Sequence, residues 1–107
     1  MAIIQEWLEE DFDRAMTEPA VLVDFFATWC GPCKMMMKVL EKIAEPLDDD
    51  SIKIAKIDIE KAPELAARFD IRTVPTFVFF KHGEVQNTMV GVISQQALSE
   101  AVQLIME

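Results

Sequence analysis

The chain has 107 residues, 51% of them hydrophobic, and a formal net charge of −9 at pH 7. This length suits one compact domain whose core needs no disulfide staples, and we expect a single domain over residues 1–107. The negative charge argues against a nucleic-acid partner, because the surface would repel phosphate groups instead of releasing counterions.

The start of the chain carries no export or membrane signal. Met1 is followed within five residues by Glu6, and neither a basic segment nor a long apolar run is present. A signal peptide and a membrane span each require such a run. We therefore expect a soluble cytoplasmic protein that does not contact membranes. We also expect it to be a monomer.

The first quarter of the chain predicts strand, helix and strand in turn. Residues 3–4 indicate a short edge strand, and residues 8–16 place an apolar side chain at every fourth position, as an amphipathic helix does. Residues 21–26 form a nearly continuous apolar, β-rich run, which is typical of a buried central strand. Only Asp24 interrupts this run.

The middle of the chain continues the alternation. After residue 30 the apolar period becomes that of an amphipathic helix, which we expect to run to about Pro46. Four isoleucines mark a strand region over residues 52–59, and Pro63 begins a short helix that reaches Phe69. Short helical crossovers of this kind join parallel strands and cover both faces of a sheet.

The last third changes character. Residues 76–80 and 84–90 are strand-like and are separated only by residues 81–83, a spacing that indicates a hairpin and makes the sheet mixed. Ser94 offers an N-cap for a final helix with an apolar face over residues 97–105.

The only two cysteines lie in the segment Trp29-Cys30-Gly31-Pro32-Cys33-Lys34. If Cys30 lies just before the helix and Cys33 in its first turn, backbone N–H groups and the helix dipole favour Cys30 as a thiolate. Cys30 is then the nucleophile, and Cys33 is the resolving thiol that attacks the mixed disulfide and releases the product. Pro32 has no N–H group, fits an early helical position and stiffens the link between them.

Other uses of the cysteine pair have weaker support. A structural disulfide would close so short a loop that the chain-entropy estimate is only about 2 kcal/mol before strain. Zinc needs four ligands, and besides this pair the chain offers only His82 as a further soft ligand, so zinc would require sharing between subunits and we expect no metal. Haem attachment needs a histidine directly after the second cysteine, where this chain has Lys34.

Several separated motifs resemble those of the thioredoxin family in order and spacing. They are residues 23–35 around the cysteine pair, then Lys56-Ile57-Asp58, Val74-Pro75-Thr76 and Gly91. The resemblance covers essentially the whole chain. It implies an α/β thioredoxin fold, with a central mixed five-stranded sheet flanked by four helices.

The resemblance also implies a role for the acid in the apolar strand. Asp24 matches the buried carboxylate that the family carries beneath its dithiol, and an acid in such a run is costly unless it is functional or paired. We expect Asp24 to accept the proton of Cys33 through water, with Lys56 close enough to tune it. The competing interpretation is a strand-end acid exposed to water.

Substrate contacts follow from the same resemblance. Val74-Pro75 matches the family's cis-proline opposite the cysteines, where the Val74 backbone would pair with an extended substrate, although an X-Pro bond taken alone is trans by default. Trp29 resembles the aromatic that flanks the nucleophile, whereas an aromatic at a strand end is more often core packing. Gly91 matches a glycine beside the substrate groove, or else relieves backbone crowding in a strand. The predicted substrate-binding residues are Trp29, Gly31, Pro32, Val74, Pro75 and Gly91.

Three positions depart from the family pattern. Lys38 stands within the long helix where the family usually carries a kinking proline, so we expect a straighter helix. Phe26 replaces a common tryptophan, and Thr73 occupies a position often held by a smaller residue. These departures bear on partner preference and stability more than on the type of reaction.

The function implied by the resemblance is that of a general protein-disulfide reductase with no bound cofactor. NADPH would act only through thioredoxin reductase, and the recipients would be enzymes such as ribonucleotide reductase, peroxiredoxin or methionine sulfoxide reductase. Two alternatives stay open. One is a disulfide oxidase or isomerase, which usually accompanies an export signal and a different dipeptide between the cysteines. The other is a non-enzymatic binding or assembly module of the same fold.

Overall fold

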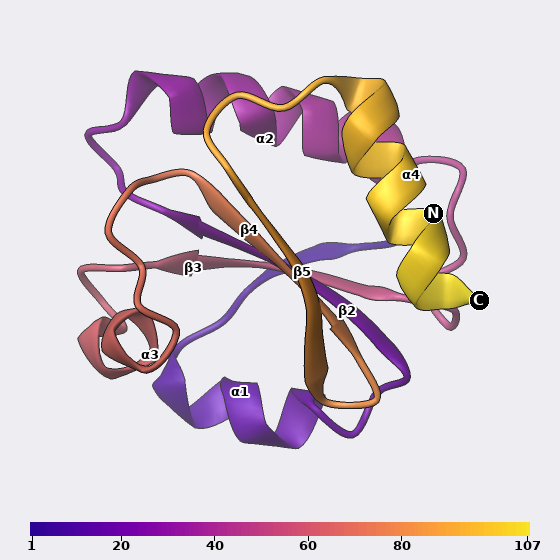
Figure 1. Ribbon diagram of the computed structural model, residues 1–107, viewed down its shortest axis with the longest axis horizontal. Coiled ribbons are helices and arrows are strands. Elements are labelled where there is room, and N and C mark those ends of the chain that lie inside the picture. The colour runs from indigo at the N-terminus through magenta and orange to yellow at the C-terminus, as the bar shows by residue number, and fades with distance from the viewer.

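The computed structural model describes the whole chain, residues 1–107, and arranges its five strands in the order β1-β3-β2-β4-β5 (Figure 1). The elements are β1 Ile4–Glu6, α1 Glu9–Ala15, β2 Ala20–Phe26, α2 Gly31–Ala44, β3 Lys53–Asp58, α3 Pro63–Arg68, β4 Thr76–Lys81, β5 Glu84–Val90 and α4 Gln95–Met106. Strands β1, β3 and β2 are parallel, whereas β4 and β5 are added antiparallel. The predicted mixed sheet flanked by four helices is confirmed.

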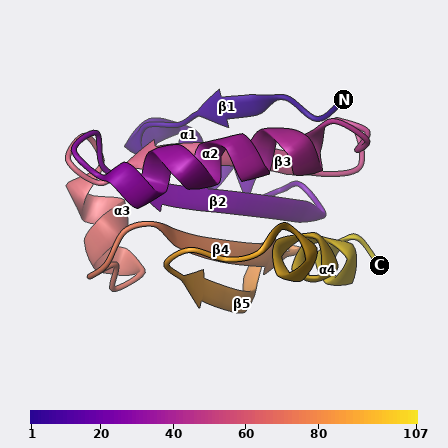
Figure 2. The same ribbon diagram turned by 90° about the horizontal axis from the view of Figure 1, so that it is seen from above.

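Two helices cover each face of the sheet. Helices α2 and α4 lie on one face and α1 and α3 on the other (Figure 1), with α2 over the parallel strands and α4 packed against β4 and β2 (Figure 2). Side chains alternate along β2 between two cores: Leu22 packs under α2 and α4, and Val23 and Phe25 face α1 and α3. Asp24 lies two residues after Leu22, so its side chain points to the same face of the sheet. Its carboxyl therefore points to the face that α2 covers.

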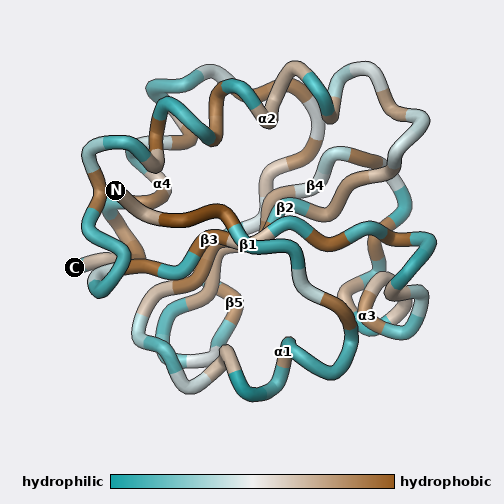
Figure 3. Tube along the Cα trace, turned by 180° about the vertical axis from the view of Figure 1, so that it is seen from behind, coloured by the Kyte–Doolittle hydropathy of each residue, from teal (hydrophilic) through white to brown (hydrophobic).

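Helices α1 and α3 each bury one residue, Phe12 and Leu65. Figure 3 shows α1 as largely hydrophilic, and its one buried residue is Phe12, whose ring packs against two other phenylalanine rings at centroid distances of 5.3 and 5.7 Å. Ala62, the N-cap residue of α3, has no side chain that could accept a hydrogen bond. The side chain of Glu9 on α1 supplies the missing cap, because its Oε1 accepts hydrogen bonds from the backbone N–H groups of Glu64 and Leu65.

The hairpin turn is shorter than predicted. Only His82 and Gly83 lie between the strands, with φ of 51° and 81°. Two successive residues with positive φ are what a two-residue type I′ turn requires. Lys81 belongs to β4, where it pairs with Glu84. The start of α4 agrees with the prediction, because the Ser94 hydroxyl accepts a hydrogen bond from a backbone N–H of the first turn at 3.1 Å.

Helix α2 ends at Ala44, just before the predicted end at Pro46. Proline has no N–H to continue the helical ladder, so the series closes with the Glu45 N–H donating to the Glu41 carbonyl at 3.2 Å. The helix is unbroken through Lys38, which replaces the kinking proline of the family. None of the four helices combines the length and apolar character needed to cross a bilayer.

Candidate redox site

The two cysteines lie at the start of α2, as their spacing predicts. Cys30 is the N-cap residue and Cys33 falls in the first helical turn, and the two form a disulfide. Their exposed fractions are 5% and 4%, so only the edge of the pair meets solvent. Elsewhere the structure gathers no group of three or more His, Cys, Asp or Glu side chains that could hold a metal ion.

The Cys30 sulfur occupies the position of a helix cap. It accepts a hydrogen bond from the Cys33 N–H at 3.1 Å. A helix N-terminus presents unpaired N–H groups and a partial positive charge, which stabilise a thiolate at this position once the disulfide is reduced. Pro32 lies in the first turn, where its missing N–H costs no helical hydrogen bond.

The loop before β4 faces the cysteines. Val74 packs against the cysteine pair, its carbonyl oxygen lies 3.8 Å from the Cys30 sulfur, and the Val74-Pro75 bond is cis, as the resemblance implied. Gly91 lies directly after β5 and donates its N–H to the Pro75 carbonyl at 2.9 Å. Its φ is 90° and a Cβ would meet nothing within 4 Å, so backbone conformation explains this glycine and crowding does not.

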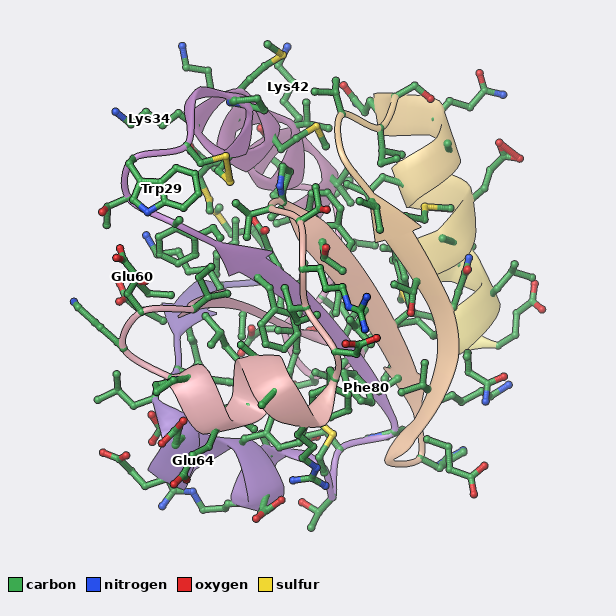
Figure 4. All side chains as sticks on the ribbon, turned by 60° about the vertical axis from the view of Figure 1, so that its left-hand side comes forward. Trp29, Lys34, Lys42, Glu60, Glu64 and Phe80 are labelled. Atoms are coloured by element: carbon green, nitrogen blue, oxygen red, sulfur yellow. A yellow bond between two sulfur atoms is a disulfide. The ribbon has the colours of Figure 1, made fainter.

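Trp29 lies on the surface. Its exposed fraction is 68%, and Figure 4 shows it at the outer edge of the molecule beside the start of α2, with Lys34 nearby. Core packing, the common use of an aromatic at a strand end, is therefore wrong for this residue. A large apolar side chain exposed next to Cys30 is available to contact a partner.

Asp24 is buried completely, and neither of its carboxyl oxygens has a hydrogen-bond partner in the structure. Burial raises its pKa from 3.8 to about 7, and the positive charge of Lys56 opposes the rise. Exposure to water at a strand end is thus wrong for this acid. A buried carboxyl that titrates near neutral pH can exchange protons during a thiol reaction.

Lys56 lies opposite Asp24 on β3 but forms no ion pair with it. The two residues are Cα partners in the parallel register, yet the Lys56 Nζ lies 4.0 Å from Glu6 Oε1 and 5.5 Å from the centre of the Phe26 ring. A groove of about 280 Å³ joins this lysine to Cys33, and it is lined by Phe26, Ala27, Thr28, Cys33, Lys34, Met37 and Lys56. Water can therefore reach the neighbourhood of Cys33 from the side of Lys56.

Sequence reasoning missed Glu6 and the groove-lining role of Phe26 and Met37. Glu6 ends β1 and pairs in register with Lys56, a relationship that only the alignment of β1 with β3 reveals. Three successive methionines, Met35 to Met37, follow Cys33 closely in the sequence and could have indicated an apolar surface beside it. Their positions differ in the structure: Met36 is fully buried, Met35 is 55% exposed and Met37 lines the groove.

A disulfide-bonded cysteine pair lies at the N-terminus of α2, the Val74-Pro75 loop packs against it, and a buried carboxyl lies on the sheet face that α2 covers. These features define the class of the protein as a thiol-disulfide oxidoreductase. The thioredoxin family model matches residues 3–104. The chain belongs to the thioredoxin family, and its activity is that of a protein-disulfide reductase.

Individual relatives resemble the chain over nearly its full length. The thioredoxin of Bacillus subtilis is 40% identical over 102 residues, which are 95% of this chain and 96% of the relative, and that of Listeria monocytogenes is 37% identical over 94% and 96%. Among solved structures, Malassezia sympodialis thioredoxin aligns with a TM-score of 0.87 at 35% identity, covering 100% of this chain and 94% of that one. A mutant thioredoxin from Halobacterium salinarum gives 0.83 at 35% identity, over 99% and 91%.

Proposed function

We propose that the chain is a general dithiol reductant with Cys30 as nucleophile and Cys33 as resolving thiol. The Cys30 thiolate attacks one sulfur of a substrate disulfide, which breaks that bond, forms a mixed disulfide and expels the other substrate sulfur as a thiolate. Cys33, after losing its proton, attacks the Cys30 sulfur and releases the second substrate thiolate. Two electrons pass to the substrate, which takes up two protons, and the Cys30–Cys33 disulfide remains.

One observation carries this assignment: the Cys30 sulfur caps α2 and accepts the Cys33 N–H at 3.1 Å. The donor stabilises negative charge on Cys30, whether that sulfur attacks as a thiolate or departs as one when the disulfide is reduced again. Cys33 lies within the first turn and has no equivalent position at the helix cap. This difference supports the order of attack.

We assign to Asp24 the acceptance of the Cys33 proton, through water in the groove beside Lys56. Full burial, two unpartnered oxygens and a pKa of about 7 support this role, since such a carboxyl is available as a base at neutral pH. Lys56 acts on Asp24 through its charge. In this proposal it biases the carboxyl toward the ionised form that accepts a proton.

The proposed substrate surface surrounds the exposed edge of Cys30. An extended substrate segment would pair with the Val74 backbone beside Pro75, while Trp29 supplies apolar contact area. A Cβ added at Gly31 would meet no atom within 4 Å, so this side of the helix start is open to a partner. The proposed binding residues remain Trp29, Gly31, Pro32, Val74, Pro75 and Gly91.

The electron source proposed for the cycle is an NADPH-dependent thioredoxin reductase, as family membership suggests. Ribonucleotide reductase, peroxiredoxin and methionine sulfoxide reductase are proposed recipients. The chemistry uses only the two sulfurs, so we propose that it operates without a bound cofactor. A single-domain monomer in the cytoplasm fits a carrier that must be kept reduced between partners.

The test is reduction of insulin disulfides by the purified protein with thioredoxin reductase and NADPH. Cys30→Ser should abolish turnover, and Cys33→Ser should accumulate a mixed disulfide at Cys30 that mass spectrometry detects. A binding or assembly module would instead keep its biological activity in the Cys30→Ser, Cys33→Ser double variant. A reduction potential of about −270 mV supports a reductase, whereas one of about −120 mV would identify an oxidase.

A further inference from the structure

A row of charged side chains crosses the sheet beneath the redox site. The strand order β1-β3-β2 and the parallel registers align Glu6 with Lys56 and Lys56 with Asp24. On the far side of Asp24 the row continues into β4 with Phe77, which is buried and uncharged. Lys56 is therefore the only cation in the row and has a carboxyl on each side.

The ammonium group of Lys56 lies nearer to the outer carboxyl. Its Nζ is 4.0 Å from Glu6 Oε1, whereas Asp24 has no ion pair and no hydrogen-bond partner. The Phe26 ring, 5.5 Å from the Nζ, provides a cation–π contact at the same place. The Nζ of a second lysine, Lys61, lies 3.7 Å from Glu6 Oε2. Each carboxyl oxygen of Glu6 therefore lies near one ammonium group at the edge of the sheet.

We propose that Glu6 is a positioning residue of the redox site, which draws the ammonium group of Lys56 toward the sheet edge and away from the Asp24 carboxyl. The inference rests on the proposed role of Asp24 as proton acceptor, and it adds a residue that never touches the reacting sulfurs. Without Glu6, the flexible lysine side chain is free to turn toward the only other carboxyl in the row. Glu6 thereby keeps the buried carboxyl less ionised near neutral pH.

Lys56 is the neighbour of Asp24 that also contacts Glu6. Asp58 lies two residues after Lys56 on β3, and so on the same face, but it is held by a hydrogen bond that its Oδ1 accepts from the Glu60 N–H at 2.9 Å. The first turn of α2 contributes Cys30 and Cys33, which do not titrate while they form a disulfide. Lys34 lies further out on α2 and lines the groove together with Lys56. The packed face of α4 is apolar and consists of Leu98, Ala101, Val102 and Ile105.

The experiment is a ¹³C NMR titration of the Asp24 carboxyl in the oxidised protein, where no thiol interferes. Glu6→Gln should lower the Asp24 midpoint by about 0.3 pH units, a shift suited to one partly exposed charge that acts across neighbouring strands. Glu6→Asp, which keeps the charge, should restore most of the original midpoint. Glu10→Gln is the matched control, because this glutamate lies on α1 on the other face of the sheet and should leave the midpoint unchanged.

A double-mutant cycle separates action through Lys56 from a direct effect of the Glu6 charge. In a Lys56→Met background, Glu6→Gln should shift the midpoint much less than in the native background. An unchanged midpoint in Glu6→Gln, or equal shifts in both backgrounds, would overturn the proposal. Either result leaves insulin reduction by the native protein intact, whereas failure of that assay would count against the proposed function itself. In the reductase assay, Glu6→Gln should move the acid limb of the pH profile in the same direction as the NMR midpoint.

Discussion

Asp24 and Lys56 lie opposite each other on adjacent parallel strands, yet they form no ion pair. The carboxyl is fully buried, so its ionisation is opposed mainly by loss of solvation and is helped only at a distance by the lysine. The result is a carboxyl in the middle of the sheet that holds its proton to neutral pH. Its side chain lies on the sheet face that is covered by α2, the helix whose first turn holds Cys33.

The raised pKa of Asp24 predicts how stability depends on pH. Between pH 3.8 and about 7 the native protein keeps a proton that the unfolded chain releases, so the free energy of unfolding falls as pH rises through this window. At about 1.4 kcal/mol per pKa unit, the contribution present at pH 4 and absent at pH 8 is on the order of 4 kcal/mol.

Asp24→Asn should therefore raise the free energy of unfolding at pH 8 by about 2 to 4 kcal/mol, and should change it far less at pH 4. Urea unfolding of the oxidised proteins at both values measures this difference. The exposed Asp50→Asn variant makes the same chemical change and should have little effect at either pH. Equal stabilisation by Asp24→Asn at pH 4 and pH 8 would contradict the account. The same substitution should slow insulin reduction at pH 7, because in the proposed mechanism Asp24 accepts the Cys33 proton.

Exposure of Trp29 predicts that this residue acts in binding and not in folding. Trp29→Ala should raise the KM for insulin about five- to tenfold through lost contact area, with unfolding free energy within about 0.5 kcal/mol of the native value. A small aromatic disulfide, which does not extend over the surface, should be reduced at nearly the native rate. Trp7→Ala gives the opposite pattern: this tryptophan is 5% exposed, and its removal should cost about 3 kcal/mol of stability. A stability loss in Trp29→Ala of similar size would show that Trp29 packs in the core.

The elements of the fold could be predicted because each one buries a regular pattern of side chains. The apolar run of β2 reflects burial on both faces, and the i, i+4, i+7 spacing of Met36, Leu40 and Ile43 reflects the single buried face of α2. The order of the cysteines along α2 follows from the same periodicity. The bounds of the hairpin turn are harder to predict. Lys81 belongs to β4, although a charged residue next to His82 and Gly83 is equally typical of a loop.

The surroundings of the cysteines depend on contacts between distant strands. The row Glu6, Lys56 and Asp24 exists only because β1 pairs with β3 and β3 with β2 in one particular register. A shift of one residue would turn Glu6 to the other face of the sheet, and neither propensity nor spacing determines that register locally. The exposure of Trp29 could not be predicted either, because an aromatic residue that follows a strand in the sequence can be buried or exposed. Only the packed structure shows that it is exposed.

The capping of α3 by Glu9 predicts a local loss of stability. Glu9→Ala removes the acceptor for two N–H groups at the helix N-terminus and should cost about 1 kcal/mol. Glu10→Ala, in the same turn of α1 but without a hydrogen bond to α3, should cost less than half as much. Hydrogen exchange at the amides of Glu64 and Leu65 is the specific readout, and it should accelerate only in Glu9→Ala. Acceleration of the same amides in both variants would point to general loosening of α1.

Two glycines have positive φ, Gly83 and Gly91, and they predict different losses of stability when a methyl group is added. Gly83 has φ of 81°, and a Cβ there would lie 3.3 Å from the Met16 carbonyl oxygen, so Gly83→Ala combines backbone strain with a close contact and should cost about 2 kcal/mol. Gly91 has φ of 90° but open space around it, and Gly91→Ala should cost about 1 kcal/mol from the backbone alone. Gly31, at the first position of α2, has neither constraint, and Gly31→Ala should be neutral or slightly stabilising.

Urea unfolding of the three oxidised variants gives the order of these losses directly. Equal losses in Gly83→Ala and Gly91→Ala would show that the Met16 carbonyl moves aside without cost, and an equal loss in Gly31→Ala would rule out positive φ as the cause.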